Sequence, residues 1–214
     1  MMTGDPKGEW EQGVAPRKTI GLTGGIACGK STVARLLAAR GAVIVDADQL
    51  ARELVVPGSE GLAATVEAFG ADVLKEDGTL NRAALGARVF GDPAALARMN
   101  ALMRPRIEAL ALHRLAEASQ RAEVPLVVFD AALLVEWGLA DRFRPLVVVV
   151  VSPEVQLARL VARDGLSAEA AAARIASQWP VADKARVADH VLDNSGGPES
   201  LAAQVEALWQ ILVS

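Results

Sequence analysis

Short apolar runs and longer amphipathic segments alternate along this chain from Thr19 onward. Five of the apolar runs predict β-strands, at Thr19–Thr23, Ala42–Asp46, Val124–Asp130, Pro145–Ser152 and His190–Leu192. Strands with few polar positions are typical of a parallel sheet that helices cover on both faces. The pattern therefore predicts an α/β fold of three layers (α/β/α), with a five-stranded parallel sheet in the middle.

The stretch between the second and third predicted strands is about 80 residues long, which exceeds a simple crossover. Apolar residues recur there with helical spacing at Leu62–Phe69, Arg82–Val89 and Pro93–Ala118. We predict a helical insertion at about 50–120. Insertions at the carboxyl edge of such a sheet usually shape the site for a second substrate.

A second pair of helices is predicted at Pro153–Arg163 and Ser167–Trp179. The arginines of this pair make residues of about 153–180 a candidate lid. Residues 1–18 are rich in Gly, Pro and charge and carry few large apolar side chains. They predict a flexible extension, followed by one domain at 19–214.

Composition narrows the class of protein further. The chain has 214 residues, of which 52% are hydrophobic, enough for one buried core with added elements. Its apolar runs are far shorter than the ~20 residues that cross a bilayer, so we expect no membrane partner. One cysteine and two histidines predict neither a disulfide nor a zinc site, and the net charge of -4 argues against a nucleic-acid partner. We expect a cytoplasmic protein, and a monomer.

The clearest motif follows the first predicted strand. Gly24 to Ser31 reads Gly-Gly-Ile-Ala-Cys-Gly-Lys-Ser and matches the phosphate-binding pattern G-x-x-x-x-G-K-[ST], with a helical run after it. An ordinary Gly-rich turn would not explain the Lys-Ser pair. We expect backbone N–H groups and Lys30 to bind ATP phosphates and the Ser31 hydroxyl to bind Mg²⁺. The predicted ATP-binding residues here are Gly24, Gly25, Ile26, Ala27, Cys28, Gly29, Lys30, Ser31 and Thr32.

Cys28 allows two interpretations. Its place at a helix N-terminus beside Lys30 could make it a reactive thiol. It could equally be a small side chain that the loop tolerates. We favour the second interpretation, and under the first one a bound nucleotide should protect the thiol.

Acidic residues end two of the predicted strands. Asp46 and Asp48 follow an apolar strand, and a carboxylate there can accept the proton of an incoming hydroxyl group. We predict this role for Asp48, with Asp46 as support, although either acid could simply cap the next helix. Asp130 ends another strand and is a candidate Mg²⁺ ligand. Glu136 could belong to the same site or start a helix.

Arginines of the candidate lid could stabilise charge on a transferring phosphoryl group. Arg159 and Arg163 lie four residues apart on one predicted helix, and Arg174 lies on the next. Any of them could instead be a surface residue paired with Glu154 or Glu169. We favour a catalytic role for Arg159 and leave Arg174 open.

Four stretches, taken in order, carry a resemblance to a known family. They are Gly21–Ile26 leading into the phosphate loop, Asp46–Asp48 continuing to Ala51 and Arg52, Asp77–Arg82, and Ala188–Gly196. From Thr19 onward the chain resembles the dephospho-coenzyme A kinase family, whose members have a P-loop nucleoside triphosphate hydrolase-type fold.

The resemblance implies ATP-dependent, Mg²⁺-dependent phosphorylation of the ribose 3'-hydroxyl of dephospho-coenzyme A, the last step of coenzyme A synthesis. Lys30, Asp48 and Arg159 would be catalytic. The segment 189–196, with Asn194, would lie near the adenine of ATP. Arg52 and Arg82 of the insertion would hold the acceptor.

The chain departs from the family pattern at two places. It has Arg104 before a proline where the family usually has a histidine, and Asp130 is followed by two alanines where Ile-Pro is common. Both changes concern the acceptor side. Arg104 could strengthen a contact to an acceptor phosphate, because arginine binds phosphate in a bidentate way.

Three other functions are compatible with a phosphate loop. The first is a P-loop kinase for a nucleoside monophosphate or another hydroxy metabolite, since the loop does not name the acceptor. The second is a GTP-dependent switch, but the chain has no Asn-Lys-x-Asp segment for guanine. The third is an inactive ATP-binding module, against which Lys30, Ser31, Asp48 and Arg159 argue together.

Overall fold

The structure is a computed structural model that describes residues 18–89 and 92–214. The predicted N-terminal extension, apart from Lys18, lies outside the described residues. The chain divides into two compact units. The sheet unit comprises Leu115–Ser214 together with the chain up to Val45, and the helical unit is Asp46–Arg114.

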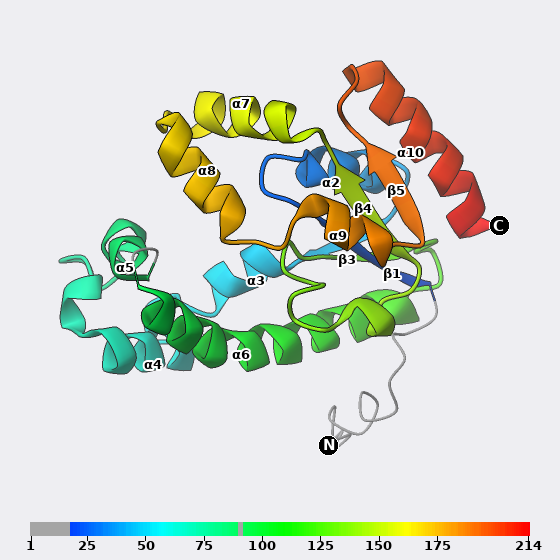
Figure 1. Cartoon of the computed structure of the whole chain (residues 1–214). Helices are drawn as coiled ribbons and strands as arrows, with labels where there is room; N and C mark the ends of the chain where they lie inside the picture. Colours follow the sequence, from blue (N-terminus) through cyan, green and yellow to red (C-terminus); the bar gives the residue numbers. More distant parts are fainter. Residues whose placement is uncertain (1–17, 90–91) are drawn as a thin grey trace. The chain divides into compact units, whose positions relative to one another are not determined.

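The sheet unit contains the β-strands and the helices that cover them (Figure 1). Its elements are β1 (Thr19–Gly24), α2 (Lys30–Ala38), β2 (Val43–Asp46), β3 (Val127–Asp130), η2 (Ala140–Arg142), β4 (Leu146–Val150), α7 (Pro153–Asp164), α8 (Ala168–Ala176), α9 (Val181–Arg186), β5 (His190–Asp193) and α10 (Pro198–Val213).

The five strands form one sheet in the order β2-β3-β1-β4-β5. β1 is parallel to β3 and to β4, and β4 is parallel to β5. All six residues of β1 are buried, as expected for a central strand covered on both faces. The five predicted strands and the three-layer fold are confirmed. The phosphate loop follows β1 and therefore leaves the middle of the sheet at its carboxyl edge.

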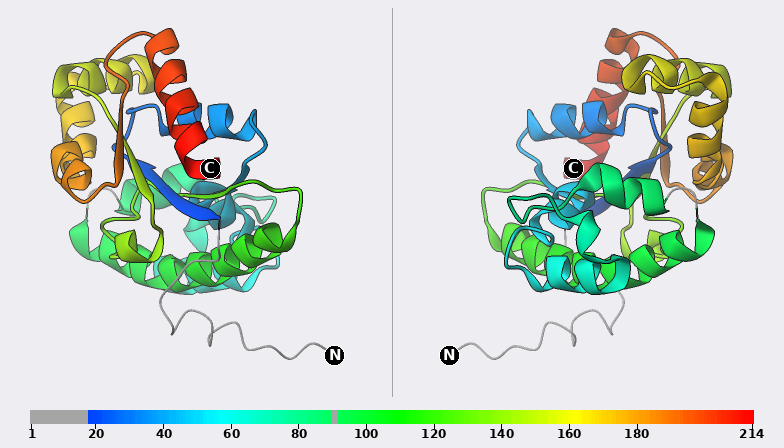
Figure 2. Two further views of the ribbon diagram at one scale, coloured as in Figure 1. Left: turned by 90° about the vertical axis from the view of Figure 1, so that its right-hand side faces the viewer. Right: turned by 90° about the vertical axis from the view of Figure 1, so that its left-hand side faces the viewer.

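Helices cover both faces of the sheet. α2 and α10 lie side by side on one face (Figure 2), where Leu22, Leu37 and Val205 belong to one buried hydrophobic cluster. On the other face, Phe129 of β3 packs against Phe143, with ring centroids 4.6 Å apart. This packing fixes β1, and with it the start of the phosphate loop, inside a rigid core.

The helical unit carries α3 (Ala47–Glu53), α4 (Glu60–Phe69), η1 (Ala71–Val73), α5 (Arg82–Val89) and most of α6 (Pro93–Gln120). The three predicted helices of the insertion are confirmed. Ser59 caps α4 by accepting a hydrogen bond from the N–H of Leu62. No described helix, α6 included, is both long and apolar enough to span a membrane.

The candidate lid consists of α7 and α8, joined by a turn at Gly165. Gly165 has a φ of 65°, the left-handed conformation that commonly ends a helix. The predicted second helix continued to Trp179, but α8 ends at Ala176. Pro180 disfavours helical geometry for the residue before it, which accounts for part of this earlier end. After the turn the chain forms the short helix α9, which the sequence pattern did not predict.

Candidate active site

The phosphate loop, Gly24–Ser31, presents the first turn of α2 to solvent. Gly29, the N-cap residue, has a φ of 91°, and it provides no side chain to cap the amides that follow. The N–H groups at the start of α2 are therefore available to an anion, and the helix dipole adds positive potential. Ala27 also has a positive φ, 60°, a conformation that is unusual outside glycine and concentrates at functional sites.

The backbone of the loop is packed too closely for larger side chains. A Cβ atom on Gly24 would lie 2.7 Å from the carbonyl oxygen of Val149. A Cβ on Gly25 would lie 2.4 Å from Val181 and 2.6 Å from the side-chain nitrogen of Gln156. Both glycines are thus required by close approach.

Two glutamines brace the loop through Ile26. The N–H of Ile26 donates to the side-chain oxygen of Gln178, and its carbonyl oxygen accepts from the side-chain nitrogen of Gln156, both over 2.9 Å. Gln156 lies on α7 and Gln178 follows α8, so both come from the candidate lid. These residues were not predicted from the sequence, because no local pattern distinguishes them from surface glutamines.

Lys30 of the phosphate loop forms an ion pair with Asp130 at the end of β3. Their side chains are 15% and 4% exposed. The register of the sheet accounts for this meeting, because Leu22 of β1 lies opposite Asp130 of β3. Each charge thus compensates the burial of the other.

Ser31 and Asp130 suit Mg²⁺ by their chemistry. Both offer oxygen ligands, and Mg²⁺ is usually held by one or two carboxylates, the phosphates of the substrate and water. Within the described residues, no three of His, Cys, Asp and Glu gather closely enough to hold a metal alone. Ser31 is exposed and directly follows Lys30, the partner of Asp130.

Cys28 belongs to the loop, and its side chain is fully buried. Burial, the largest influence on this group, raises the pKa of its thiol above the ordinary value. Because a thiol reacts as the thiolate, the structure favours the interpretation of Cys28 as a small packing residue.

Arg159, Asn194 and Cys28 are brought together by two hydrogen bonds. Arg159 of α7 donates to the backbone oxygen of Asn194 over 2.9 Å, and the side-chain amide of Asn194 donates to the backbone oxygen of Cys28 over 2.9 Å. The end of β5 therefore links the candidate lid to the phosphate loop. Asp189 lies at the start of β5, where its carboxylate accepts from the N–H of Leu146 over 2.6 Å.

The other two lid arginines share one carboxylate. Arg163 and Arg174 both donate to Asp164, each over 2.7 Å, so they tie the end of α7 to α8. Glu154 and Glu169, the partners considered from the sequence, are not the ones found. Glu136 does not start a helix, and its carboxylate contacts Lys184 of α9 over 2.7 Å.

The two acids that follow β2 have different environments. Asp46 is the N-cap of α3 and accepts from the N–H groups of Asp48 and Gln49, over 2.8 and 3.4 Å. The capping alternative therefore describes Asp46. Asp48 lies exposed in the first turn of α3.

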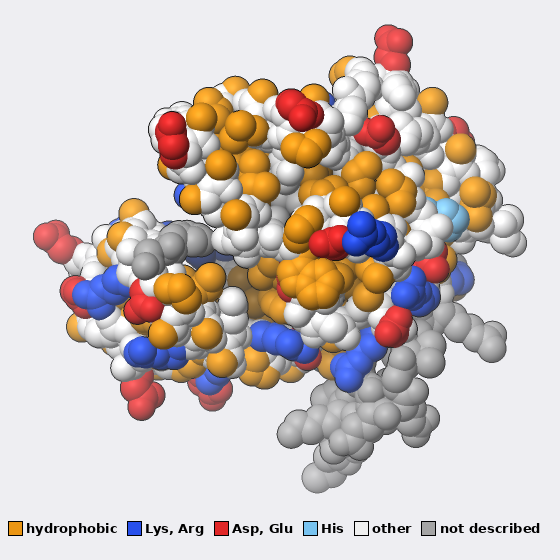
Figure 3. Space-filling model, in the orientation of Figure 1, with side chains coloured by type: hydrophobic (Ala, Val, Ile, Leu, Met, Phe, Trp, Pro, Cys, Tyr) orange, Lys and Arg blue, Asp and Glu red, His pale blue; other side chains and the backbone are white. Residues whose placement is uncertain are grey.

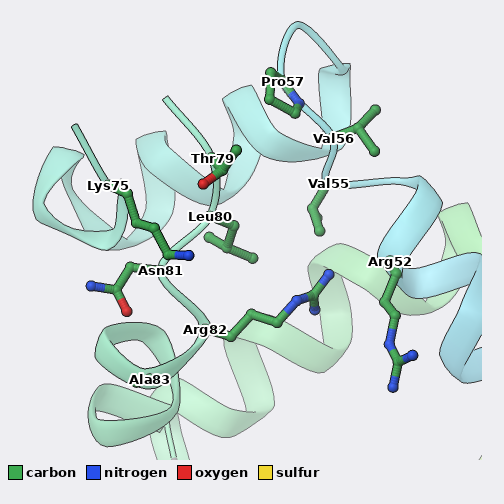
Figure 4. A pocket seen from close by; sticks show the side chains of 10 residues that line it. All are labelled: Arg52, Val55, Val56, Pro57, Lys75, Thr79, Leu80, Asn81, Arg82 and Ala83. Atoms are coloured by element: carbon green, nitrogen blue, oxygen red, sulfur yellow. The ribbon is translucent and has the colours of Figure 1, made fainter. Parts of the chain in front are cut away.

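The helical unit contains a pocket of about 440 Å³ (Figure 4). Of the described residues that line it, three are cationic, Arg52, Lys75 and Arg82, and none is acidic. Figure 4 shows Arg82 extending from the start of α5 toward Arg52, while Lys75 points toward Leu80. By contrast, acidic and basic side chains are mixed over this unit on the face shown in Figure 3. The pocket is thus suited to an anionic ligand.

Arg52 and Arg82 were predicted from the sequence as acceptor-binding residues, whereas Lys75 was not. A turn at Asp77 and Gly78 brings Lys75 back toward Arg82, and the N–H of Lys75 donates to the oxygen of Thr79 over 2.8 Å. The Asp-Gly pair predicts such a tight turn, so it could have indicated that Lys75 lies near Arg82. Arg104 is not among the lining residues; it pairs with Glu108 over 2.5 Å along α6.

Comparisons with known proteins decide the family. The family model described as "Dephospho-CoA kinase" matches residues 18–199. The chain belongs to the dephospho-CoA kinase family. A dephospho-CoA kinase of Geobacter sulfurreducens is 49% identical over 190 residues, which are 89% of this chain and 96% of the relative. One of Cutibacterium acnes is 45% identical over 95% of this chain and 88% of its own length.

Two solved structures have a similar fold. A Thermus thermophilus protein, 33% identical, matches with a TM-score of 0.75 over 92% of this chain and 98% of its own. A dephospho-CoA kinase from Campylobacter jejuni is 24% identical with a TM-score of 0.63, over 92% of this chain and 97% of its own. The latter likeness supports the fold alone.

The close packing around Gly25 predicts that Gly25→Ala impairs nucleotide binding. The added methyl group would lie 2.4 Å from Val181 and 2.6 Å from Gln156, so these side chains or the loop itself must shift. We expect kcat/KM for ATP to fall about 10- to 100-fold. Gly197→Ala is the matched control, because a Cβ there meets nothing within 4 Å. Equal activity of both variants would contradict the prediction.

Cys28 is the only cysteine of the chain, so thiol labelling reports on it alone. At pH 8 its raised pKa leaves little thiolate, and burial blocks access. We expect a disulfide reagent to modify the folded protein on the order of 100-fold more slowly than the protein in urea. Similar rates in both states would show that Cys28 is accessible and reactive.

Proposed function

We propose that this protein transfers the γ-phosphoryl group of ATP to the ribose 3'-hydroxyl group of dephospho-coenzyme A. The products are coenzyme A and ADP, and the reaction is the final step of coenzyme A biosynthesis. The observation that carries the proposal is an intact phosphate loop, with Lys30 paired to Asp130, in a chain 49% identical to a dephospho-CoA kinase.

The sheet unit binds ATP in this proposal. Residues Gly24–Thr32 surround the phosphates, with N–H groups at the start of α2 donating to them, and Lys30 turns from Asp130 toward the β- and γ-phosphates. Arg159 lies beside Asn194, at the end of β5, and from there it stabilises the charge that develops during transfer. The Asn194 region contacts the adenine.

Mg²⁺ bound with ATP would neutralise part of the phosphate charge during transfer. Ser31 offers its hydroxyl group for this ion, and Asp130 offers its carboxylate once Lys30 has moved to the phosphates. The same two residues orient the nucleotide by fixing the position of its triphosphate at the end of β1.

The helical unit supplies the acceptor side. Asp48 accepts the proton of the 3'-hydroxyl group while the oxygen of that hydroxyl group forms a bond to the γ-phosphorus. The bond from the γ-phosphorus to the bridging oxygen of ADP breaks. Dephospho-coenzyme A carries a diphosphate, and the cationic pocket with Arg52, Lys75 and Arg82 suits that charge. Arg104 is a further candidate for this contact.

An acceptor panel tests the proposal and the role of Asp48 together. Protein and Mg-ATP are incubated with dephospho-coenzyme A, adenosine, AMP, shikimate or gluconate while ADP release is followed. We expect turnover with dephospho-coenzyme A and loss of about 100-fold or more of kcat in Asp48→Asn, as for a general base. Asp141→Asn alters a carboxylate that is 93% exposed and should remain active.

The same assay compares turnover with other acceptors. Shikimate is included because a shikimate kinase from Acinetobacter baumannii shares the fold, with 18% identity and a TM-score of 0.53. Preference for any acceptor other than dephospho-coenzyme A would overturn the acceptor assignment but leave the phosphate-loop chemistry. Absence of turnover with all of them would favour an ATP-binding module.

The charge of the pocket gives a separate prediction. Lys75→Ala and Arg82→Ala should each raise KM for dephospho-coenzyme A about 5- to 50-fold, because each removes a charge-assisted contact to phosphate. KM for ATP should not change. Arg98→Gln is the control, since this residue of α6 does not line the pocket. Unchanged acceptor KM in both variants would contradict an acceptor site here.

A further inference from the structure

A lysine with no exposed surface lies behind the phosphate loop. Lys184, on α9, is 0% exposed. Its ammonium group contacts the carboxylate of Glu136 over 2.7 Å and donates to the carbonyl oxygen of Ala132 over 2.8 Å. A buried ammonium group is unfavourable unless it is paired and hydrogen-bonded, so these two partners restrict where α9 can lie.

The oxygen atom of Glu136 that contacts Lys184, Oε1, also binds a second group. Its Oε1 also accepts a hydrogen bond from the N–H of Trp179 over 3.1 Å. Its Oε2 is buried and has no hydrogen-bond partner within the described residues. One carboxylate thus contacts both Trp179 and Lys184, which lie near the two ends of residues 178–184. We call residues 178–184 the return segment, because they lead from the lid back to the sheet.

The return segment also contacts the phosphate loop. Gln178 accepts from the N–H of Ile26 over 2.9 Å, and Val181 packs so closely over Gly25 that a Cβ there would be 2.4 Å away. The carbonyl oxygen of Ala132, which binds Lys184, also accepts from the hydroxyl group of Thr23 over 3.2 Å. The contacts to Gly25 and Ile26 of the loop therefore depend on the position of one segment.

We propose that Glu136 and Lys184 are positioning residues for the nucleotide. Their ion pair holds the return segment against the phosphate loop, and the segment in turn holds Ile26 and Gly25 in the conformation that leaves the amides of α2 open to the phosphates of ATP. Neither side chain needs to touch ATP in this role. The proposal depends on ATP as the donor and not on the identity of the acceptor.

The test compares Lys184→Met, Glu136→Gln and the double variant in two measurements, the Tm of the free protein and the Kd for Mg-ATP by calorimetry. Each single change leaves a buried group unpaired, so we expect a Tm lower by roughly 5 °C or more. The double variant removes both buried charges and should regain most of the Tm. Its ATP affinity should nevertheless stay about tenfold weaker, because the return segment is no longer fixed.

Arg186→Met is the matched control on the same helix. Arg186 is 77% exposed and pairs with exposed Asp183, and an ion pair in solvent contributes little to stability, so both Tm and Kd should be unchanged. In the active protein, KM for ATP should rise in the double variant while KM for the acceptor stays constant. A double variant that regains Tm and ATP affinity together would overturn the proposal, because the pair would then serve stability alone.

Gln178→Ala keeps the proposal testable if Lys184→Met fails to fold. Gln178 is partly exposed, so its loss should leave Tm unchanged while Kd for Mg-ATP rises several-fold. That result would support a link from the return segment to the nucleotide through Ile26. Unchanged ATP affinity in Gln178→Ala would show that the return segment does not position the loop.

Discussion

A phosphate loop must keep backbone N–H groups open toward an anion, and a chain can do so only if other parts of the structure hold that backbone in place. Gly29 leaves the first turn of α2 without a side-chain cap, and Ala27 adopts a positive φ. Neither feature is favourable by itself. The hydrogen bonds to Ile26 from the lid and to Cys28 from the end of β5 supply the missing restraint.

The cationic side chains of the two units have different surroundings. In the sheet unit, the partly buried ammonium group of Lys30 and the fully buried one of Lys184 each contact a carboxylate, which limits the free energy lost on burial. In the helical unit, Arg52, Lys75 and Arg82 line one pocket whose described residues include no carboxylate. Paired cations fix the backbone, whereas cations gathered without acids suit a charged ligand.

Several features followed from the sequence because their cause is local. The strand before the loop, the glycines and the Lys-Ser pair are adjacent in the chain. The β1 strand is found where the pattern predicts it, and a helix follows the loop as expected, although α2 already begins at Lys30. The helices of the insertion follow from the spacing of apolar residues. The capping role of Asp46 was one of two alternatives, and only the hydrogen bonds to Asp48 and Gln49 distinguish them.

The sequence by itself determined the layer architecture, the phosphate loop and the resemblance to a kinase family, because these depend on periodicity and on residues close together in the chain. Only the tertiary structure revealed the partners of distant residues. Gln178 contacts Ile26 across 152 residues of chain, and Lys184 contacts Glu136 across about 50. Lys30 contacts Asp130 because β1 and β3 pair in one register. Such contacts are set by how strands and helices pack, and no local pattern encodes them.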